Sequence, residues 1–362
     1  MKLKIFSLIT AIALILCLFC GCTDDSNQNS LSTSSEKTSS VQSKEEPKKI
    51  TYLNNLTGCM EFDSAEQVMT RPVAVMVNNL SKAQKVQTGL SKASIVYETV
   101  VEGGITRLLA IFKSFDDVGD IGTIRSARYS YLDLANGHDA LYFHCGADEI
   151  YFKPYANQLS SDHIDINVGV NNKYGKRVKN GLESEHTMYT SASLITKALS
   201  DKNRRTQLKS DSVHANMWQN FAPEDKTVTY NDGVATKASV FFSASYVTTF
   251  NYDTSTKMYV KSNKSGNSTD YKTGKKNSYK NVLVLFARVT NFADNYHTKV
   301  HLDSGNGYYL TNGTLKQIKW SKGNSNSPFK ITDLDGNTVE FNAGNTYVCI
   351  PPASNKDKTS IS

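Results

Sequence analysis

The residues of this chain that are best suited to chemistry lie between Glu98 and Arg107, where two acids and an arginine flank a glycine pair. Residues 95–112 are mostly β-branched and apolar on both sides of Gly103-Gly104, which predicts two strands joined by a tight hairpin. With a two-residue loop, Glu98, Glu102 and Arg107 share one face, and Arg107 lies diagonally between the carboxylates. Two interpretations stay open: a structural ion cluster, or a site that holds a polar or sugar-like ligand.

A second pair of charged residues, Arg125 and Arg128, falls at or before the first turn of a helix predicted over 126–136. The positive end of a helix dipole disfavours arginine, so we expect an anion nearby. The anion can be one of the protein's own carboxylates, Glu98, Glu102 or Asp120. It can equally be a bound phosphate or carboxylate, which forked guanidinium donors suit well.

The signals for catalysis and for metal binding are weak. The chain has no Gly-x-Ser-x-Gly motif, and no local pattern marks Cys145 as a catalytic thiol. Carboxylates four residues apart on one strand are separated by about 13 Å, too far for the usual glycosidase pair. A hydrolase that uses a carboxylate of this cluster, assisted by His144 or His186, remains an alternative. We identify no catalytic residue, lean against an enzyme, and expect no cofactor and no metal site.

The elements that position these residues predict an α+β fold. Apolar runs at 72–77 and 141–144 read as buried strands, and a helix is expected over 191–200, capped by Thr190 or Ser191. From about residue 239, β-branched and aromatic runs alternate with turn dipeptides such as Asn312-Gly313. We therefore predict an α/β domain with a mixed sheet over 51–205 and a mostly antiparallel β domain over 206–362.

The first 50 residues predict a lipid anchor and a tether. Two lysines precede an apolar run of about 15 residues, too short for an ordinary membrane span, and the sequence Cys20-Gly-Cys22 follows. This pattern is typical of a lipoprotein signal peptide over 1–21, cleaved before a lipid-modified Cys22. Residues 22–50 are polar and cannot bury enough surface to fold, so we expect a disordered tether. The folded part is then held at the extracytoplasmic face of the bacterial cell membrane.

Composition narrows the class of partner. Without the two N-terminal lysines, the basic residues exceed the acidic ones by 39 − 34 = 5, and seven lysines lie between Lys257 and Lys280. Outside the cell, anionic headgroups or wall polymers are the available counter-surfaces, and nucleic acid is not expected as a partner. The three remaining cysteines, Cys59, Cys145 and Cys349, are too few and too scattered for a disulfide framework.

Several segments resemble the YerB family of bacterial lipoproteins. The resemblance rests on Arg71-Pro-Val-Ala-Val-Met-Val-Asn-Asn, on Val101-Glu-Gly-Gly-Ile-Thr-Arg and on Gly122-Thr-Ile-Arg-Ser-Ala-Arg, and extends from about residue 61 to 352. It implies an N-terminal α/β unit followed by a β-rich unit. Because the family is one of unknown function, it implies no activity and supplies no catalytic residues.

These observations lead to one main hypothesis and two alternatives. The main one is a surface lipoprotein that binds an anionic or sugar-like envelope component, such as a cell-wall polymer, through Glu98, Glu102, Arg107, Arg125 and Arg128. The first alternative is the peptidoglycan- or glycan-acting hydrolase considered above. The second is a scaffold for an envelope protein, which would present a large apolar surface.

Overall fold

The apolar runs of the sequence form the middle of one large sheet. The computed structural model describes residues 51–209, 213–264 and 266–362, so the predicted signal peptide, Cys22 and the tether lie outside the described residues. Every residue of Val73–Asn78, Ile95–Val100 and Thr106–Phe112 is buried, as expected for strands that are covered on both faces. None of the helices in these ranges is both long enough and apolar enough to span a bilayer.

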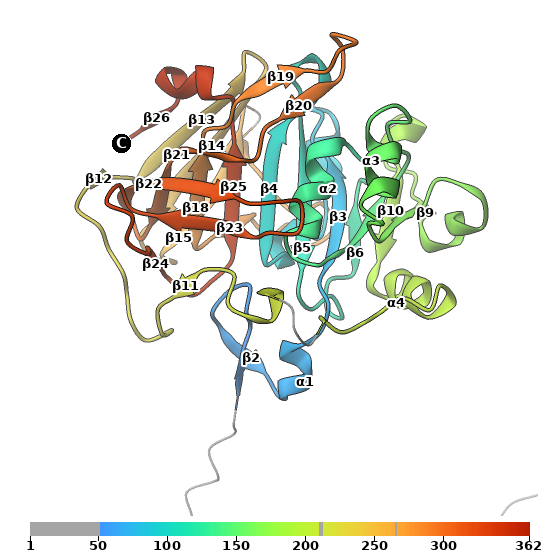
Figure 1. Ribbon diagram of the computed structural model, residues 1–362, viewed down its shortest axis with the longest axis horizontal. Helices are drawn as coiled ribbons and strands as arrows, with labels where there is room; N and C mark the ends of the chain where they lie inside the picture. The colour runs from blue at the N-terminus through green and yellow to red at the C-terminus, as the bar shows by residue number, and fades with distance from the viewer. Residues whose placement is uncertain (1–50, 210–212, 265) are drawn as a thin grey trace, which may run out of the picture. The chain divides into compact units, whose positions relative to one another are not determined.

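This central sheet has eleven strands (Figure 1). In spatial order they are β12 (Gly233–Val234), β22 (Thr314–Lys322), β21 (Ser304–Thr311), β18 (Asn281–Leu285), β25 (Thr346–Ile350), β4 (Ile95–Val100), β5 (Thr106–Phe112), β3 (Val73–Asn78), β7 (Leu141–His144) and β8 (His163–Asp165), with β23 (Phe329–Thr332) beside β22. Strands β18, β25, β4, β3, β7 and β8 run in one direction, and β5 is antiparallel to both of its neighbours.

A second sheet packs on one face of β25 and β4. Its strands are β16 (Gly266–Asn267), β15 (Met258–Asn263), β14 (Tyr246–Asp253), β13 (Lys237–Ser243) and β26 (Ser360–Ile361), with β17 (Ser278–Tyr279) beside β15. Edge contacts of Phe250 and Tyr279 with the ring of Tyr347 on β25 join the two layers. Aromatic rings therefore line part of the interior between the sheets.

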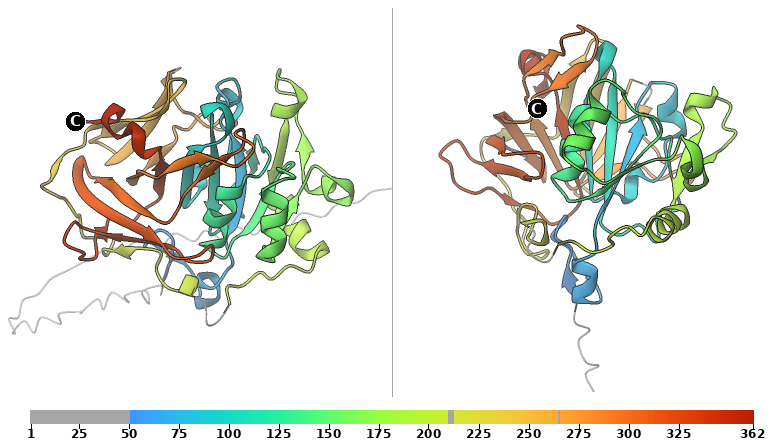
Figure 2. Two further views of the ribbon diagram at one scale, coloured as in Figure 1. Left: turned by 45° about the horizontal axis from the view of Figure 1, so that its top comes forward. Right: turned by 45° about the vertical axis from the view of Figure 1, so that its right-hand side comes forward.

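All four α-helices of the described residues lie between residues 65 and 201, and α2 lies over β4 and β5 (Figures 1 and 2). The hydroxyl of Tyr131 on α2 reaches the backbone of Thr99 and Arg107, on the face opposite the second sheet. The α-helices are α1 (Ala65–Val68), α2 (Tyr129–Asn136), α3 (Phe152–Gln158) and α4 (Ala192–Asp201). Short 3₁₀ turns are η1 (Ala83–Val86), η2 (Leu90–Lys92), η3 (Glu102–Gly104), η4 (Gly169–Tyr174), η5 (Ser184–His186), η6 (Val213–Ala215) and η7 (Ala353–Lys358).

Smaller sheets complete the fold. They are β1 (Tyr52–Leu53) with β2 (Met60–Phe62), β6 (Asp120–Gly122) with β10 (Met188–Ser191) and β9 (Lys176–Arg177), β11 (Asn220–Phe221) with β24 (Glu340–Phe341), and β19 (Val289–Asn291) with β20 (Thr298–Val300). In Figure 1 the orange β19–β20 hairpin, from the second half of the chain, extends over β4 from the first half.

The α+β class is confirmed, with 19% helix and 39% strand. Ser191 caps α4 as expected, and Asn312-Gly313 forms the hairpin turn between β21 and β22 with two positive φ angles. The predicted helix over 126–136 begins later, at Tyr129, because Arg128 is extended and Ala127 is bridged to Ala147. The division near residue 205 stays a prediction; Lys49–Ser362 clusters as one unit, and β25 pairs with β4 across that point.

Candidate functional site

The hairpin between β4 and β5 has a different register from the one predicted. Thr99 pairs with Arg107 and Glu98 with Leu108, so the connection is one residue longer than a two-residue loop. Gly103 and Gly104 both take left-handed φ angles of 68°, and Val101 donates to the carbonyl of Ile105 at 2.8 Å. A shift of one residue moves a side chain to the other face of a sheet. The expectation that Glu98 and Arg107 share a face is therefore wrong.

Glu98 points between the two sheets instead. Its carboxylate is fully buried and accepts four hydrogen bonds, from Asn79 at 3.0 Å, Thr106 and Thr248 at 2.8 Å, and Tyr347 at 2.6 Å. Burial lowers the pKa of nearby Lys261, and the Glu98 carboxylate opposes that change. With its oxygens saturated by interior donors, Glu98 holds the layers together and is separated from the other predicted site residues.

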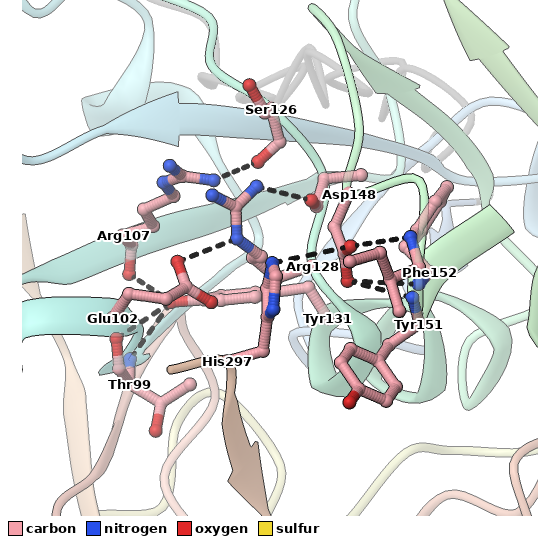
Figure 3. A network of polar contacts seen from close by, with 12 residues as sticks. Thr99, Glu102, Arg107, Ser126, Arg128, Tyr131, Asp148, Tyr151, Phe152 and His297 are labelled. Carbon is pink, nitrogen blue, oxygen red and sulfur yellow. Dashed lines mark hydrogen bonds and ion pairs between the residues drawn. The ribbon is translucent and has the colours of Figure 1, made fainter. Parts of the chain in front are cut away.

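The other four residues do come together: Glu102, Arg107 and Arg128 lie on the face that carries α2 (Figure 3), and the charge of Arg125 reaches Arg107. We call Glu102, Arg107, Arg125 and Arg128 the arginine cluster. The Glu102 carboxylate, in a residue that is 8% exposed, accepts from Nε of Arg128 at 2.8 Å. Arg107 is 5% exposed and donates to the carbonyl of Ser126. Arg125 lies at the border of the cluster, 3.8 Å from the half-exposed carboxylate of Glu185.

An extended segment holds the two later arginines in place. Asn78 donates to the carbonyl of Thr123 at 2.8 Å, and Arg125 donates to Met76 at 3.1 Å, which binds the segment to β3. On its other side, Cys145 donates to the carbonyl of Arg125 at 3.0 Å, next to the end of β7. Residues 123–127 thus lie between β3 and β7, and the backbone fixes where both guanidinium groups begin.

The electrostatics of the cluster are unbalanced. Burial, together with the positive charges of Arg128 and Arg125, lowers the pKa of Arg107 to about 9, and the Glu102 carboxylate opposes this change. Among the described residues, no carboxylate lies within 4 Å of the Arg107 guanidinium. Three cations therefore share one buried carboxylate and the partly exposed Glu185. This arrangement favours a further anion at the same place.

The location of the cluster also fits a ligand site. Glu102 follows β4, the segment 123–127 runs beside the end of β3, and Gly146 follows β7. These three strands are parallel, so their carboxyl ends meet at one edge of the sheet. In open α/β sheets, ligands bind outside the carboxyl ends of the strands.

A carboxylate and a histidine that the sequence did not connect lie beside the cluster (Figure 3). Asp148 accepts from the backbone of Ile150 at 2.8 Å and so holds the start of α3, and its side chain is 3.4 Å from Nε2 of His297. The other ring nitrogen of His297 is 2.5 Å from Asp294. His297 precedes β20 and lies 149 positions after Asp148 in the chain, and no local sequence pattern indicates their contact.

Comparison with known proteins places the chain in a family. Residues 56–205 match "Protein of unknown function (DUF3048) N-terminal domain", and residues 236–348 match the corresponding C-terminal domain. A protein of Bacillus subtilis (strain 168), named "Putative lipoprotein YerB", is 31% identical over 305 residues, which cover 82% of this chain and 86% of the relative. The chain belongs to the YerB-like family.

A solved structure agrees with this assignment. The crystal structure of YerB protein from Bacillus subtilis matches the present fold with a TM-score of 0.70 and 27% identity, over 86% of this chain and 99% of the other. The resemblance predicted from the sequence is confirmed. The similarity to YerB supports the assignment of this chain as a lipoprotein of unknown function, and the family descriptions name no activity.

Two of the three segments that carry the YerB resemblance build the arginine cluster. Val101-Glu-Gly-Gly-Ile-Thr-Arg contains the longer turn, with Glu102 in it and Arg107 just after it. Ile-Arg-Ser-Ala-Arg is the extended segment that ends at Arg128, the N-cap residue of α2. These two segments of the YerB-like chain thus meet at one site.

The two histidines that the hydrolase alternative names are buried. His144 is buried, with its ring nitrogens 2.8 Å from the carbonyl of Gly146 and 2.9 Å from His163, and burial lowers its pKa to about 4. His186 is buried against Asn78, with Nε2 3.2 Å from Glu185. In the described part of the chain, no three His, Cys, Asp or Glu residues are grouped so as to hold a metal ion.

Proposed function

We propose that this YerB-like protein is a lipid-anchored surface protein that binds an anionic, sugar-like component of the cell envelope through the arginine cluster. The observation that carries the proposal is Arg107, a 5% exposed residue with two other arginines around it, while the described carboxylates that offset these three charges are buried Glu102 and half-exposed Glu185. An oxyanion of the ligand would supply the missing negative charge. Glu102, fixed by Arg128, would accept from ligand hydroxyl groups that point toward it.

The anchor belongs to the same proposal. Lipid attached to Cys22 of a cleaved chain would keep the folded part at the outer face of the membrane, and a polar tether over 22–50 would let it reach the wall. The lipoprotein name of the YerB relative supports this arrangement. The cluster would then face material that is abundant there, namely polymers that carry phosphate or carboxylate groups.

Co-sedimentation with purified cell-wall fractions tests the binding. Residues 51–362 are incubated with the wall fractions at low and at high salt, and the bound protein is measured beside Arg128→Met and Lys330→Met variants. Lys330 is an exposed residue of β23, so Lys330→Met makes the same charge change away from the cluster. We expect wild type and Lys330→Met to bind at low salt, and Arg128→Met to bind at least about tenfold more weakly, because a charge-assisted hydrogen bond is lost.

The same incubations separate binding from hydrolysis. Soluble sugar-containing products are assayed after sedimentation of the wall fraction. Release of products by wild type and not by Glu102→Gln would establish the hydrolase in place of a binding protein. Equal binding of wild type and Arg128→Met, with no products, would remove the cluster from the function and leave the protein-partner scaffold.

A further inference from the structure

A second charged site lies at the other end of β5. Arg107 is near the start of this strand, whereas Lys113 directly follows its last residue, Phe112. Lys113 is 1% exposed and lines a cavity of about 800 Å³, within the size range of small-molecule sites. Asn54, Thr57 and Ser94, all buried, line the same cavity. This cavity is distinct from the arginine cluster.

The ammonium group of Lys113 has hydrogen-bond acceptors but no counter-charge. Its Nζ donates to the carbonyls of Val68 at 2.6 Å and Thr70 at 2.7 Å. An ammonium has three N–H donors, and the described residues provide no acceptor for the third and no carboxylate within 4 Å. A buried cation in this state is costly unless something anionic approaches it.

The charges on the cavity wall are arranged by depth. The charged side chains other than Lys113 are all exposed, and they carry both signs: Lys92, Lys275, Lys276, Glu61, Asp116 and Asp117. Lys113 is thus the buried charged group of the cavity, with the hydroxyl of Ser94 beside its backbone nitrogen. The inner wall is cationic, whereas the rim is balanced.

We infer that this cavity binds a small molecule through an oxyanion, a phosphate or a carboxylate, that contacts Lys113. The cavity is much larger than an inorganic ion, so the rest of the molecule would lie toward the rim, where lysines and acids are both available to its polar groups. Two of the rim lysines, Lys275 and Lys276, belong to the lysine-rich stretch between Lys257 and Lys280. Asp270 holds this loop in place by accepting from Gly89 at 2.6 Å.

The dependence of binding on pH follows from the depth of Lys113. Burial lowers the pKa of Lys113 to about 7, so the amine is charged at pH 6 and largely neutral at pH 8. Cys59, which also lines the cavity, stays a neutral thiol because burial raises its pKa to about 11. Anion binding should therefore weaken from pH 6 to pH 8.

Sulfate is a suitable probe because its charge does not change over this range. The full-length chain in nonionic detergent is titrated with sulfate at pH 6 and pH 8, and the side-chain NMR signals of its lysines are followed. Acetate and glycerol 3-phosphate titrations then distinguish a carboxylate from a phosphate ligand. We expect sulfate to shift the Lys113 signals at pH 6. At pH 8 the apparent affinity for sulfate should be at least about tenfold lower, in proportion to the charged fraction of Lys113.

The sulfate titration is repeated in an Arg107→Met chain, in which the arginine cluster is disabled. Sulfate binding at Lys113 can then be judged separately from the proposed function of the arginine cluster. Binding that persists in Arg107→Met and is lost in Lys113→Met supports the inference. Lys113→Met removes two hydrogen bonds to backbone carbonyls. If this variant does not fold, the response of the Lys113 signals in the unmodified chain shows whether the cavity binds the anion. Lys113 signals that do not respond to sulfate, acetate or glycerol 3-phosphate at pH 6 would overturn the inference.

Discussion

Replacing Arg107 with methionine should stabilise the protein and remove its binding to the wall fraction through the arginine cluster. Methionine has a similar volume and no charge, so it keeps the packing of this 5% exposed position while it relieves the repulsion from Arg125 and Arg128. If Arg107 were merely a structural donor to the Ser126 carbonyl, the same change would destabilise the fold. The two interpretations therefore predict opposite signs.

The magnitude follows from the charge. The ordinary pKa of arginine is 12.5, and a fall to about 9 corresponds to about 5 kcal/mol against the charged form in the folded state. Because the folded pKa is the lower one, this penalty is fully present below pH 9 and fades between the two values. Loss of the hydrogen bond to Ser126 costs about 1.5–3 kcal/mol. At pH 7 we expect a net stabilisation of about 2–3 kcal/mol.

Urea unfolding of residues 51–362 at pH 7 measures this change, with Lys330→Met as the matched control. Lys330 is exposed on β23, and its change should stay within about 0.5 kcal/mol. Wall binding is measured on the same samples. An Arg107→Met variant that is less stable than wild type, or that is more stable and still binds the wall fraction, would contradict the binding role of Arg107.

Three further predictions concern the interior. Glu98→Gln should destabilise the fold by about 3 kcal/mol in urea unfolding, because it leaves buried Lys261 without a carboxylate; a loss below 1 kcal/mol would show that the pair is dispensable. Burial lowers the pKa of His138 to about 3, so the contribution of neutral His138 to the stability of the fold is present above pH 6.5 and is lost as the pH falls toward 3. In thermal unfolding, the His138→Asn variant should therefore lose less stability than wild type between pH 7 and pH 4. Equal losses in the two proteins would contradict this prediction. A Cβ at position 307 would lie 2.3 Å from the carbonyl oxygen of Val284, so Gly307→Ala should lower the free energy of unfolding by about 2–4 kcal/mol. Gly233→Ala should lower it less, because a Cβ there meets only the Leu315 side chain, at 3.2 Å. The reverse order would be inconsistent with the β18–β21 pairing.

The strands and helices of this fold could be predicted where a local pattern determines them. The buried runs at β3 and β7 are continuous apolar segments, and Ser191 marks the start of α4 as an N-cap. The pairing of β25 with β4 joins segments about 250 residues apart, and no local pattern reports it. The change in composition near residue 205 therefore predicts a division of the chain there, because the pairing that crosses this point leaves no local signal.

The candidate site shows the same limit at a finer scale. The sequence indicated that Glu102, Arg107, Arg125 and Arg128 could act together, because glycines mark a turn and arginines at a helix start require an anion. It could not give the hairpin register, which depends on whether the turn uses two residues or three. That one residue places Glu98 among the donors between the sheets instead of beside Arg107.

The approach of Asp148 to His297 could not be predicted for a further reason. It depends on how the β19–β20 hairpin packs against the start of α3, and the stacking of Tyr151 on Phe292 at 3.9 Å is part of that contact. Both rings belong to segments that read as ordinary loops in the sequence.

The most direct test of the arginine cluster is to locate an anion on it. Crystals of residues 51–362 are soaked in selenate, whose selenium gives a specific anomalous signal, and crystals of the Arg107→Met variant are treated in the same way. The proposal predicts a selenium peak within hydrogen-bond distance of the Arg107 and Arg128 guanidinium groups in wild type, and none there in the variant. A wild-type map with selenium elsewhere and none at these two arginines, or an equal peak in both crystals, would contradict it.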